Sequence, residues 1–176
     1  MENILRNQIV SHMMENSLFY DEQRGFVPRR LCMTQLLIAI ELWTELLDTG
    51  APLDVIYLDF KKALDSVPHK RLLSKLDAYG IGDHIKKWIK SFLVNRKQRF
   101  TLNGIMSSLS EVLSGIPQGS ILGPILFVIF INDLLDAVTS TTKTFADDTK
   151  LFKAIRGPED REKLQNDLNQ LVKWSE

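Results

Sequence analysis

The chain has 176 residues, 44% of them hydrophobic, which is enough for one folded domain with its own core. Its single cysteine, Cys32, excludes an intramolecular disulfide. The longest apolar stretch, residues 121–131, contains glycine and proline and is too short to span a bilayer, and no secretion signal opens the chain. We therefore expect an intracellular protein, nuclear or cytoplasmic, with no membrane association.

The formal net charge is zero, but the charges are unevenly distributed along the chain. Residues 1–60 carry 4 basic and 9 acidic side chains, and residues 100–176 carry 7 and 10. Residues 61–99, in contrast, carry 11 basic and 3 acidic side chains. A basic segment between acidic flanks suits a phosphate backbone as partner. The alternative is a solvated helical face whose charge is balanced by neighbouring acids.

The first third of the chain predicts two helices and a loop. Residues 3–18 have the spacing of an amphipathic helix with Ile4 and Ile9 on one face, and we expect His12 to be structural or exposed. Glycine and proline make residues 24–31 a loop. A core-facing helix should follow over residues 32–48 and end before Gly50. Its apolar positions are Leu36, Leu37, Ile40, Trp43, Leu46 and Leu47.

A short apolar strand is predicted over residues 54–60, and it delivers Asp59 close to its carboxyl end. Asp59 has two plausible roles. It can belong to a group of acids that binds a metal, or it can cap the helical segment that follows, a frequent task for aspartate.

The basic middle of the chain predicts two helices and a hairpin. Pro68 occupies the first position of one helix, which Gly80 ends, and Asp83 caps the next. A hairpin should form from residues 98–102 and 107–113, turning at Asn103-Gly104. The basic side chains of this region are Lys86, Lys87, Lys90, Arg96, Lys97 and Arg99.

Residues 114–120 predict a loop that leads into a helix over residues 121–136. Glycines let the backbone approach a ligand closely, and Gln118 offers both a donor and an acceptor. The alternative is an ordinary helix entry without a ligand.

The run from Thr144 to Phe152 predicts a β-hairpin with Asp147 and Asp148 at its tip. Two adjacent anions repel each other, and a divalent cation with oxygen ligands removes that cost. Together with Asp59 they would form a cup for two Mg²⁺ ions about 3.5–4 Å apart. The alternative for the pair is a solvated turn, because aspartate is a common turn residue.

A last helix should begin at Pro158, with an apolar stripe of Leu164, Leu168, Leu171 and Trp174. The two acid-bearing strands have to be neighbours for the cup to form. These elements predict an α+β fold, with a mixed or antiparallel sheet and helices on one of its faces.

Three blocks in a fixed order carry a family resemblance. Residues 55–70, Val-Ile-Tyr-Leu-Asp-Phe-Lys-Lys-Ala-Leu-Asp-Ser-Val-Pro-His-Lys, resemble the first palm motif of reverse transcriptases. Residues 114–127 resemble the second motif, and Phe-Ala-Asp-Asp at 145–148 the third. In detail they are most similar to retrotransposons without long terminal repeats, of the jockey and chicken-repeat type. The similarity runs from about residue 18 to the C-terminus.

The resemblance implies a polymerase palm over residues 53–176 and a fingers-like part over residues 1–52, within one domain. The family ordinarily continues beyond Leu171–Glu176 into a further palm motif and a helical thumb, so we expect the chain to be truncated before the thumb. Endonuclease and thumb regions of a longer element protein are expected, but they are absent from this chain.

The resemblance also implies site residues. Asp59 and Asp147 would bridge two Mg²⁺ ions, with Mn²⁺ as a substitute, while Asp148 completes the site and the Phe60 carbonyl is a candidate ligand. The loop over residues 24–31 resembles the fingers motif Gly-Phe-Arg-x-Gly-Arg-Ser, but of that motif's basic positions only Arg30 matches, since Val27 replaces the first arginine. The implied nucleotide-binding residues are Arg29, Arg30, Lys61, Leu64, Pro117, Gln118 and Gly119. Those implied for the nucleic-acid backbone are Lys62, Lys86, Lys87, Lys90, Arg96, Lys97 and Arg99.

The function implied is RNA-directed DNA polymerase, with an RNA template, a DNA primer and deoxynucleoside triphosphates as partners. One alternative is a degenerate element copy that keeps the fold, with little or no catalysis, and at most binds nucleic acid. Another is a metal-dependent nuclease. The Gln118 loop and Arg30 argue against the nuclease, because hydrolysis needs no nucleoside-triphosphate pocket.

Overall fold

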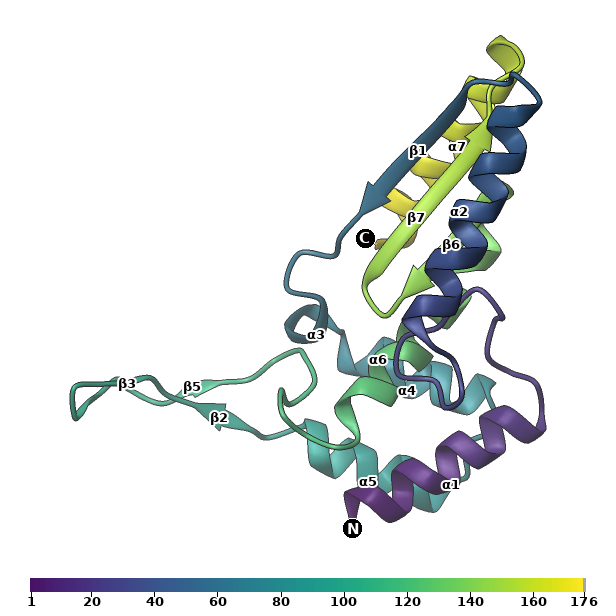
Figure 1. Ribbon diagram of the computed structural model, residues 1–176. Coiled ribbons are helices and arrows are strands. Elements are labelled where there is room, and N and C mark those ends of the chain that lie inside the picture. The colour runs from purple at the N-terminus through teal and green to yellow at the C-terminus, as the bar shows by residue number, and fades with distance from the viewer. Residues whose placement is uncertain (176) are drawn as a thin grey trace. The chain divides into compact units, whose positions relative to one another are not determined.

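The computed structural model describes residues 1–175 and divides into two compact units (Figure 1). Unit 1 consists of Met1–Leu18 and Lys61–Phe130, and unit 2 consists of Phe19–Phe60 and the chain from Ile131 onward. Within the described residues, no helix is long and apolar enough to cross a membrane.

Unit 2 is built on a three-stranded antiparallel sheet in the order β1-β7-β6. The central strand β7 pairs with β1 up to Leu58↔Thr149 and with β6 up to Phe145↔Asp148. The two acid-bearing strands are therefore neighbours, and the predicted hairpin is confirmed. Its tip differs from the prediction, because the turn is Ala146-Asp147 and Asp148 begins β7. The elements of unit 2 are α2 (Cys32–Asp48), β1 (Leu53–Leu58), the 3₁₀ helix η1 (Asn132–Ala137), β6 (Thr141–Phe145), β7 (Asp148–Ala154) and α7 (Pro158–Ser175).

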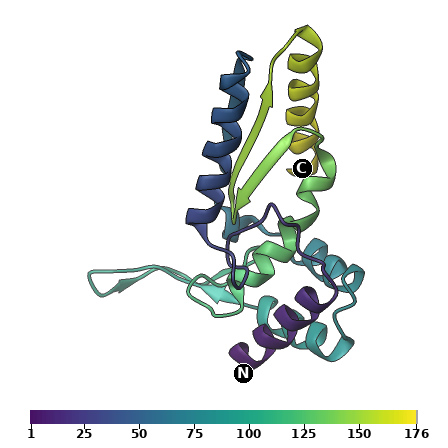
Figure 2. The ribbon, with the colours of Figure 1, turned by 45° about the vertical axis from the view of Figure 1, so that its right-hand side comes forward.

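Helices cover both faces of this sheet, α2 on one and α7 on the other (Figure 2). Successive side chains of a strand point to opposite faces. Leu151 accordingly packs into a core with Leu164 and Leu171 of α7, while the neighbouring Phe152 meets Trp43 of α2 edge to face at 5.7 Å. The α+β class is confirmed, but the expectation of helices on one face only was wrong, because β7 is apolar on both faces.

The helix α2 has the predicted bounds, but it turns a different face to the sheet. Gln35 and Ala39 are buried, whereas Leu37, Ile40 and Leu47 are 56–58% exposed. Residues 35, 39 and 43 form an i, i+4, i+8 stripe, and this narrow stripe is the contact surface. The pattern of apolar residues alone therefore predicted the wrong face of α2 as the buried one.

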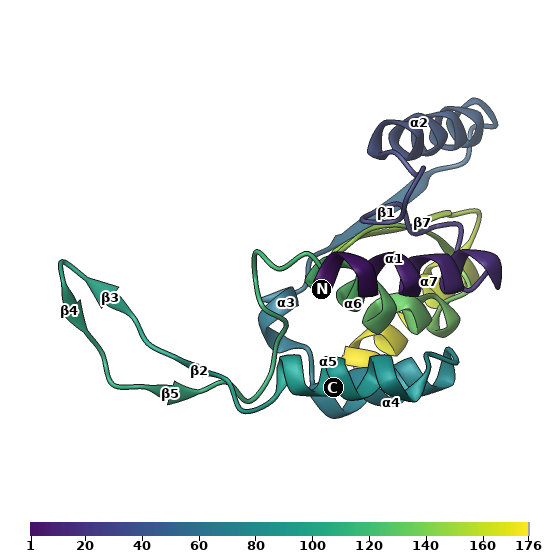
Figure 3. The same cartoon turned by 90° about the horizontal axis from the view of Figure 1, so that it is seen from below.

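Unit 1 combines helices with a two-stranded arm (Figure 3). The first helix is confirmed, although Ile4 is 60% exposed and the buried face instead contains Leu5, Ile9, Val10 and Met13. His12 Nε2 lies 2.7 Å from the Tyr79 carbonyl oxygen, so this histidine is structural, as expected. The elements of unit 1 are α1 (Glu2–Glu15), α3 (Ala63–Ser66), α4 (His69–Ala78), α5 (Asp83–Leu93), β2 (Lys97–Gln98), β3 (Thr101–Leu102), β4 (Ile105–Met106), β5 (Ser110–Glu111) and α6 (Gly123–Ile131).

The predicted arm is confirmed, with Leu102 opposite Ile105 and a turn in which Asn103 and Gly104 both have positive φ. That conformation is the type I′ turn that Asn-Gly favours.

Three helix ends differ from expectation. Pro68 and Gly82 are N-cap residues, so Asp83 lies in the first turn and pairs with Lys86 instead of capping. The helix expected to reach residue 136 ends at Ile131 and continues as η1.

A buried carboxylate joins α7 to the start of β6. Asp167 is 5% exposed and accepts hydrogen bonds from the backbone N–H groups of Thr139 and Ser140 at 3.0 and 2.8 Å. Burial raises the pKa of Asp167, but the hydrogen bonds from Ser140 and Thr139 outweigh it and hold the pKa below the usual value. The charged form is therefore the one that the fold stabilises.

We predict that Asp167→Asn lowers the free energy of unfolding at pH 7 by about 2 kcal/mol, because the amide NH₂ opposes an N–H donor. Since the folded-state pKa is depressed, this contribution is complete above the ordinary value near 3.8 and is lost as the pH falls through the folded-state value. Urea unfolding at pH 7 and at pH 3 measures both effects, with exposed Glu162→Gln of the same helix as control. An equal loss at both pH values would contradict the charge-based account.

Candidate active site

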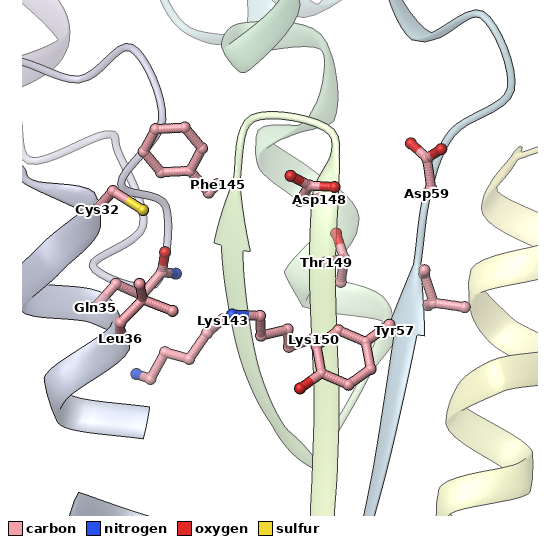
Figure 4. A pocket seen from close by; sticks show the side chains of 11 residues that line it. Cys32, Gln35, Leu36, Tyr57, Asp59, Lys143, Phe145, Asp148, Thr149 and Lys150 are labelled. Atoms are coloured by element: carbon pink, nitrogen blue, oxygen red, sulfur yellow. The ribbon is translucent and has the colours of Figure 1, made fainter. Parts of the chain in front are cut away.

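Two of the three predicted aspartates face each other across neighbouring strands. Asp59 directly follows Leu58, the last residue of β1, and Asp148 directly precedes Thr149, its pairing partner. Continuing this antiparallel register by one residue places Asp59 opposite Asp148, on the same face as Tyr57 and Lys150. Figure 4 shows both carboxylates at the same end of their strands. Asp59 and Asp148 line one pocket of about 290 Å³ in unit 2.

Asp147 occupies the turn between β6 and β7, together with Ala146. Asp147 is half-buried and does not line that pocket. Within residues 1–175, none of the three carboxylates has a hydrogen-bond or ion-pair partner, and no three acidic, histidine or cysteine groups are close enough to hold a metal ion. The donor chemistry fits a hard cation such as Mg²⁺, because carboxylate oxygens are its preferred ligands. Joint metal binding by Asp59, Asp147, Asp148 and the Phe60 carbonyl stays a prediction.

The rest of the pocket wall was not predicted. Tyr57, Lys143, Lys150 and Phe145 line it beside the aspartates, with the Lys150 ammonium 5.8 Å from the centre of the Tyr57 ring. Tyr57 and Lys150 lie two residues from Asp59 and Asp148, Phe145 pairs with Asp148, and Lys143 pairs with Lys150. The period-2 rule for strands was the signal that could have identified them.

A second missed feature is the contact between the fingers-like loop and the Asp-Asp turn. Gln23 is 3% exposed, and its side-chain Oε1 accepts a hydrogen bond from Ala146 N at 2.9 Å. Gly25 lies so close that a Cβ there would be 2.2 Å from the same nitrogen. The sequence spacing around Gln23 does not identify it as a functional residue. Only its position directly before the loop could have suggested a role.

Arg30, the predicted triphosphate ligand, is engaged within the chain. Its guanidinium donates to the carbonyl oxygens of Tyr20 and Gln23 and forms an ion pair with Asp21 at 2.9 Å. Burial lowers the pKa of Arg30 and Asp21 opposes that shift. Triphosphate binding by Arg30 stays a prediction that requires these contacts to open. Arg29 is exposed, and Val27, at the place of the missing arginine, is buried.

The Gln118 loop is attached to α3 within unit 1. Gly115 N and Ile116 N donate to the carbonyl oxygens of Val67 and Leu64 at 2.9 and 2.8 Å. The Gln118 side chain donates to the Asp65 carboxylate at 3.0 Å, which fixes its amide. The structure thus joins the Leu64 backbone to Ile116 of the Gln118 loop, and nucleotide binding by Leu64 and Gln118 stays a prediction. Gly119 is exposed beside Gln118.

A wide groove of about 890 Å³ in unit 1 collects part of the predicted basic set. It is lined by Lys61, Lys62 and Arg96 together with Pro117 and Gln118. Lys87, Lys90, Lys97 and Arg99 are exposed but do not line it. Lys86 pairs with Asp77 and Asp83, and these hydrogen bonds raise the pKa of Lys86. Phosphate binding by Lys86 therefore requires these ion pairs to open.

Comparison with known proteins identifies the family of the chain. The family model described as reverse transcriptase (RNA-dependent DNA polymerase) matches residues 1–176. The RNA-directed DNA polymerase from mobile element jockey of Drosophila funebris is 30% identical over 99% of this chain and 20% of its own length. The probable RNA-directed DNA polymerase from transposon BS of Drosophila melanogaster is 26% identical over 98% of this chain and 20% of its own length. A retrotransposable element R2 polyprotein of Popillia japonica is 30% identical over 49% of the chain and 14% of its own length.

The chain belongs to the reverse transcriptase family, and its relatives are proteins of retrotransposons without long terminal repeats. It spans about a fifth of the length of the first relatives that it matches.

Gly115 offers a test of the loop attachment. Its φ is +88°, and a Cβ there would lie 2.6 Å from the Asp65 carbonyl oxygen, whereas Gly119 has φ +79° and open space around it. Alanine in a left-handed conformation costs about 1–2 kcal/mol at either site, but Gly115→Ala must also displace α3. We predict a clearly larger loss of unfolding free energy for Gly115→Ala than for Gly119→Ala, measured by urea denaturation. Equal losses would mean that the loop is not held against α3.

Proposed function

We propose that the chain performs RNA-directed DNA synthesis as part of a retrotransposon protein, adding deoxynucleotides to a primer 3′-hydroxyl on an RNA template. The observation that carries the proposal is the facing pair Asp59 and Asp148 on the pocket side of the β1–β7 ladder. Family membership and the attached Gln118 loop support the same activity.

Asp59, Asp147 and Asp148 are the residues that would hold two Mg²⁺ ions, with Mn²⁺ as a substitute. Mg²⁺, when bound, activates the primer hydroxyl and neutralises charge on the triphosphate and on the leaving pyrophosphate. The chain supplies the negative charges that make this binding favourable, since the carboxylates repel each other while they lack a cation. Asp148 lies on β7 and Asp59 directly follows β1, so the pairing of these strands restricts the separation of the two carboxylates. The Phe60 carbonyl is a further candidate ligand.

Unit 1 supplies the residues proposed to bind the nucleotide and the nucleic-acid backbone. Gln118, whose amide donates to Asp65, is proposed to contact the nucleotide together with Leu64, whose carbonyl oxygen holds Ile116 of the same loop. Lys61, Lys62 and Arg96 line the wide groove and would contact phosphates without reading sequence. Arg29 and Arg30 of unit 2 are proposed to meet the triphosphate, because guanidinium groups match phosphate oxygens.

The metal-site assignment predicts that Asp59→Asn or Asp147→Asn lowers primer extension on a homopolymer RNA template by orders of magnitude, because each change keeps the shape but removes ligand charge. Asp54→Asn is the control, since Asp54 is exposed on β1 and does not line the pocket. It should extend at nearly the parent rate. If the extension rate of Asp147→Asn stays within about tenfold of the parent rate, roughly 1.4 kcal/mol of barrier, the metal-site assignment is wrong.

From the leucine at position 64 we predict that the chain rejects ribonucleotides only weakly. The position falls where the family usually has an aromatic ring that blocks a ribose 2′-hydroxyl, and leucine is smaller and more flexible. Leu64→Phe should therefore raise the ratio of deoxy- to ribonucleotide incorporation over the parent. Competition assays with paired nucleotides measure the ratio, and the same ratio in both proteins would show that Leu64 only packs.

A further inference from the structure

The turn that carries the catalytic aspartates has an unfavourable backbone conformation. Ala146, its first residue, has φ +53° although it is not glycine. A left-handed alanine costs about 1–2 kcal/mol, so the surrounding structure must hold it. Ala146 is also 4% exposed, which leaves its backbone polar groups dependent on partners within the protein.

The partner of Ala146 is one buried side chain, Gln23. The Gln23 Oε1 accepts from Ala146 N at 2.9 Å and from Gly25 N at 2.7 Å, while its Nε2 donates to the Ala146 carbonyl oxygen at 3.4 Å. Both backbone groups of the strained residue are therefore satisfied by the amide of Gln23. Gly25 has to be glycine for this approach, since a Cβ would meet the Ala146 nitrogen at 2.2 Å.

The segment around Gln23 is itself fixed to β6. Thr144 N donates to the Glu22 carbonyl at 3.1 Å and Arg24 N donates to the Thr144 carbonyl at 3.0 Å, so Glu22 to Arg24 run beside the strand like a short parallel partner. Arg30 holds the other side through the Tyr20 and Gln23 carbonyl oxygens. This bonding gives Arg30 a role that does not involve a triphosphate.

We propose that Gln23 is a positioning residue for Asp147 and Asp148, acting through the Ala146 backbone, and that Arg30 and Gly25 support it. The inference rests on the proposed function, because positioning matters only if the two aspartates bind metal. Gln23 fixes the peptide that precedes Asp147 and so determines the direction in which both carboxylates leave the turn. Weakening this contact lets the turn relax and separates the metal ligands.

The test compares Gln23→Met, which keeps the side-chain length but removes both hydrogen-bonding groups, with Gln23→Glu, which keeps the acceptor. Gln35→Met is the matched control, because Gln35 is also buried and donates to the Glu22 and Thr144 carbonyl oxygens at 3.2 and 2.9 Å, but not to Ala146. The first readout, amide hydrogen exchange, needs no activity. The amide hydrogen of Ala146 should exchange at least about tenfold faster in Gln23→Met, while the β7 amides remain protected. In Gln23→Glu and Gln35→Met its exchange should stay slow.

The second readout is the affinity of the chain for Mn²⁺, measured by electron paramagnetic resonance. Gln23→Met should weaken binding by about tenfold, and the metal concentration for half-maximal primer extension should rise similarly while the nucleotide KM changes little. Unchanged Ala146 exchange in folded Gln23→Met would overturn the positioning role. Faster exchange with unchanged Mn²⁺ affinity would overturn the link to the aspartates. If Gln23→Met does not fold, Gly25→Ala, read by the same amide, replaces it. Failure of the proposed function itself would appear separately, as parent-like extension by Asp147→Asn.

Discussion

The antiparallel pairing of β1 with β7 is the constraint on which the candidate site depends. The register that ends at Leu58↔Thr149 brings two acids from residues 59 and 148 to one end of the sheet. A slip by one residue would turn every side chain of β1 to the other face and send Asp59 towards α7. The apolar packing resists such a slip, because Ile56 and Leu58 of β1 pack against the core that Leu151 forms with α7 and would be turned away from it.

The residues proposed to hold metal lie in unit 2, and those proposed to contact the nucleic-acid backbone lie in unit 1. Unit 2 holds the three aspartates, and the strands and the Gln23 contact restrict where they can point. Unit 1 holds the Gln118 loop and the basic groove, which suit a nucleotide and a phosphate backbone. Catalysis of in-line phosphoryl transfer depends mainly on positioning and charge, so a rigid donor set is what such a fold must provide.

Strands and chemical motifs were predictable from the sequence where a local rule applies. The Asn103-Gly104 turn, the Asp-Asp hairpin, the limits of α2 and the start of α7 follow from turn chemistry, proline and apolar spacing. The buried face of α2 was not predictable, because Leu37 and Ile40 satisfy the apolar pattern while Gln35 and Ala39 make the contact. The roles of Gln23 and the hydrogen bonds of Arg30 were not predicted for a related reason. Both act through backbone groups distant in sequence, and a loop residue without periodicity carries no sign of such a partner.

The central claim is that Asp59, Asp147 and Asp148 bind catalytic metal together. Anomalous diffraction from crystals of the chain with a primer–template, a deoxynucleoside triphosphate and Mn²⁺ tests it most directly. We predict two anomalous peaks about 3.5–4 Å apart, in contact with Asp59, Asp147 and Asp148. Peaks only elsewhere, or none at these carboxylates while a nucleotide is bound, would contradict it.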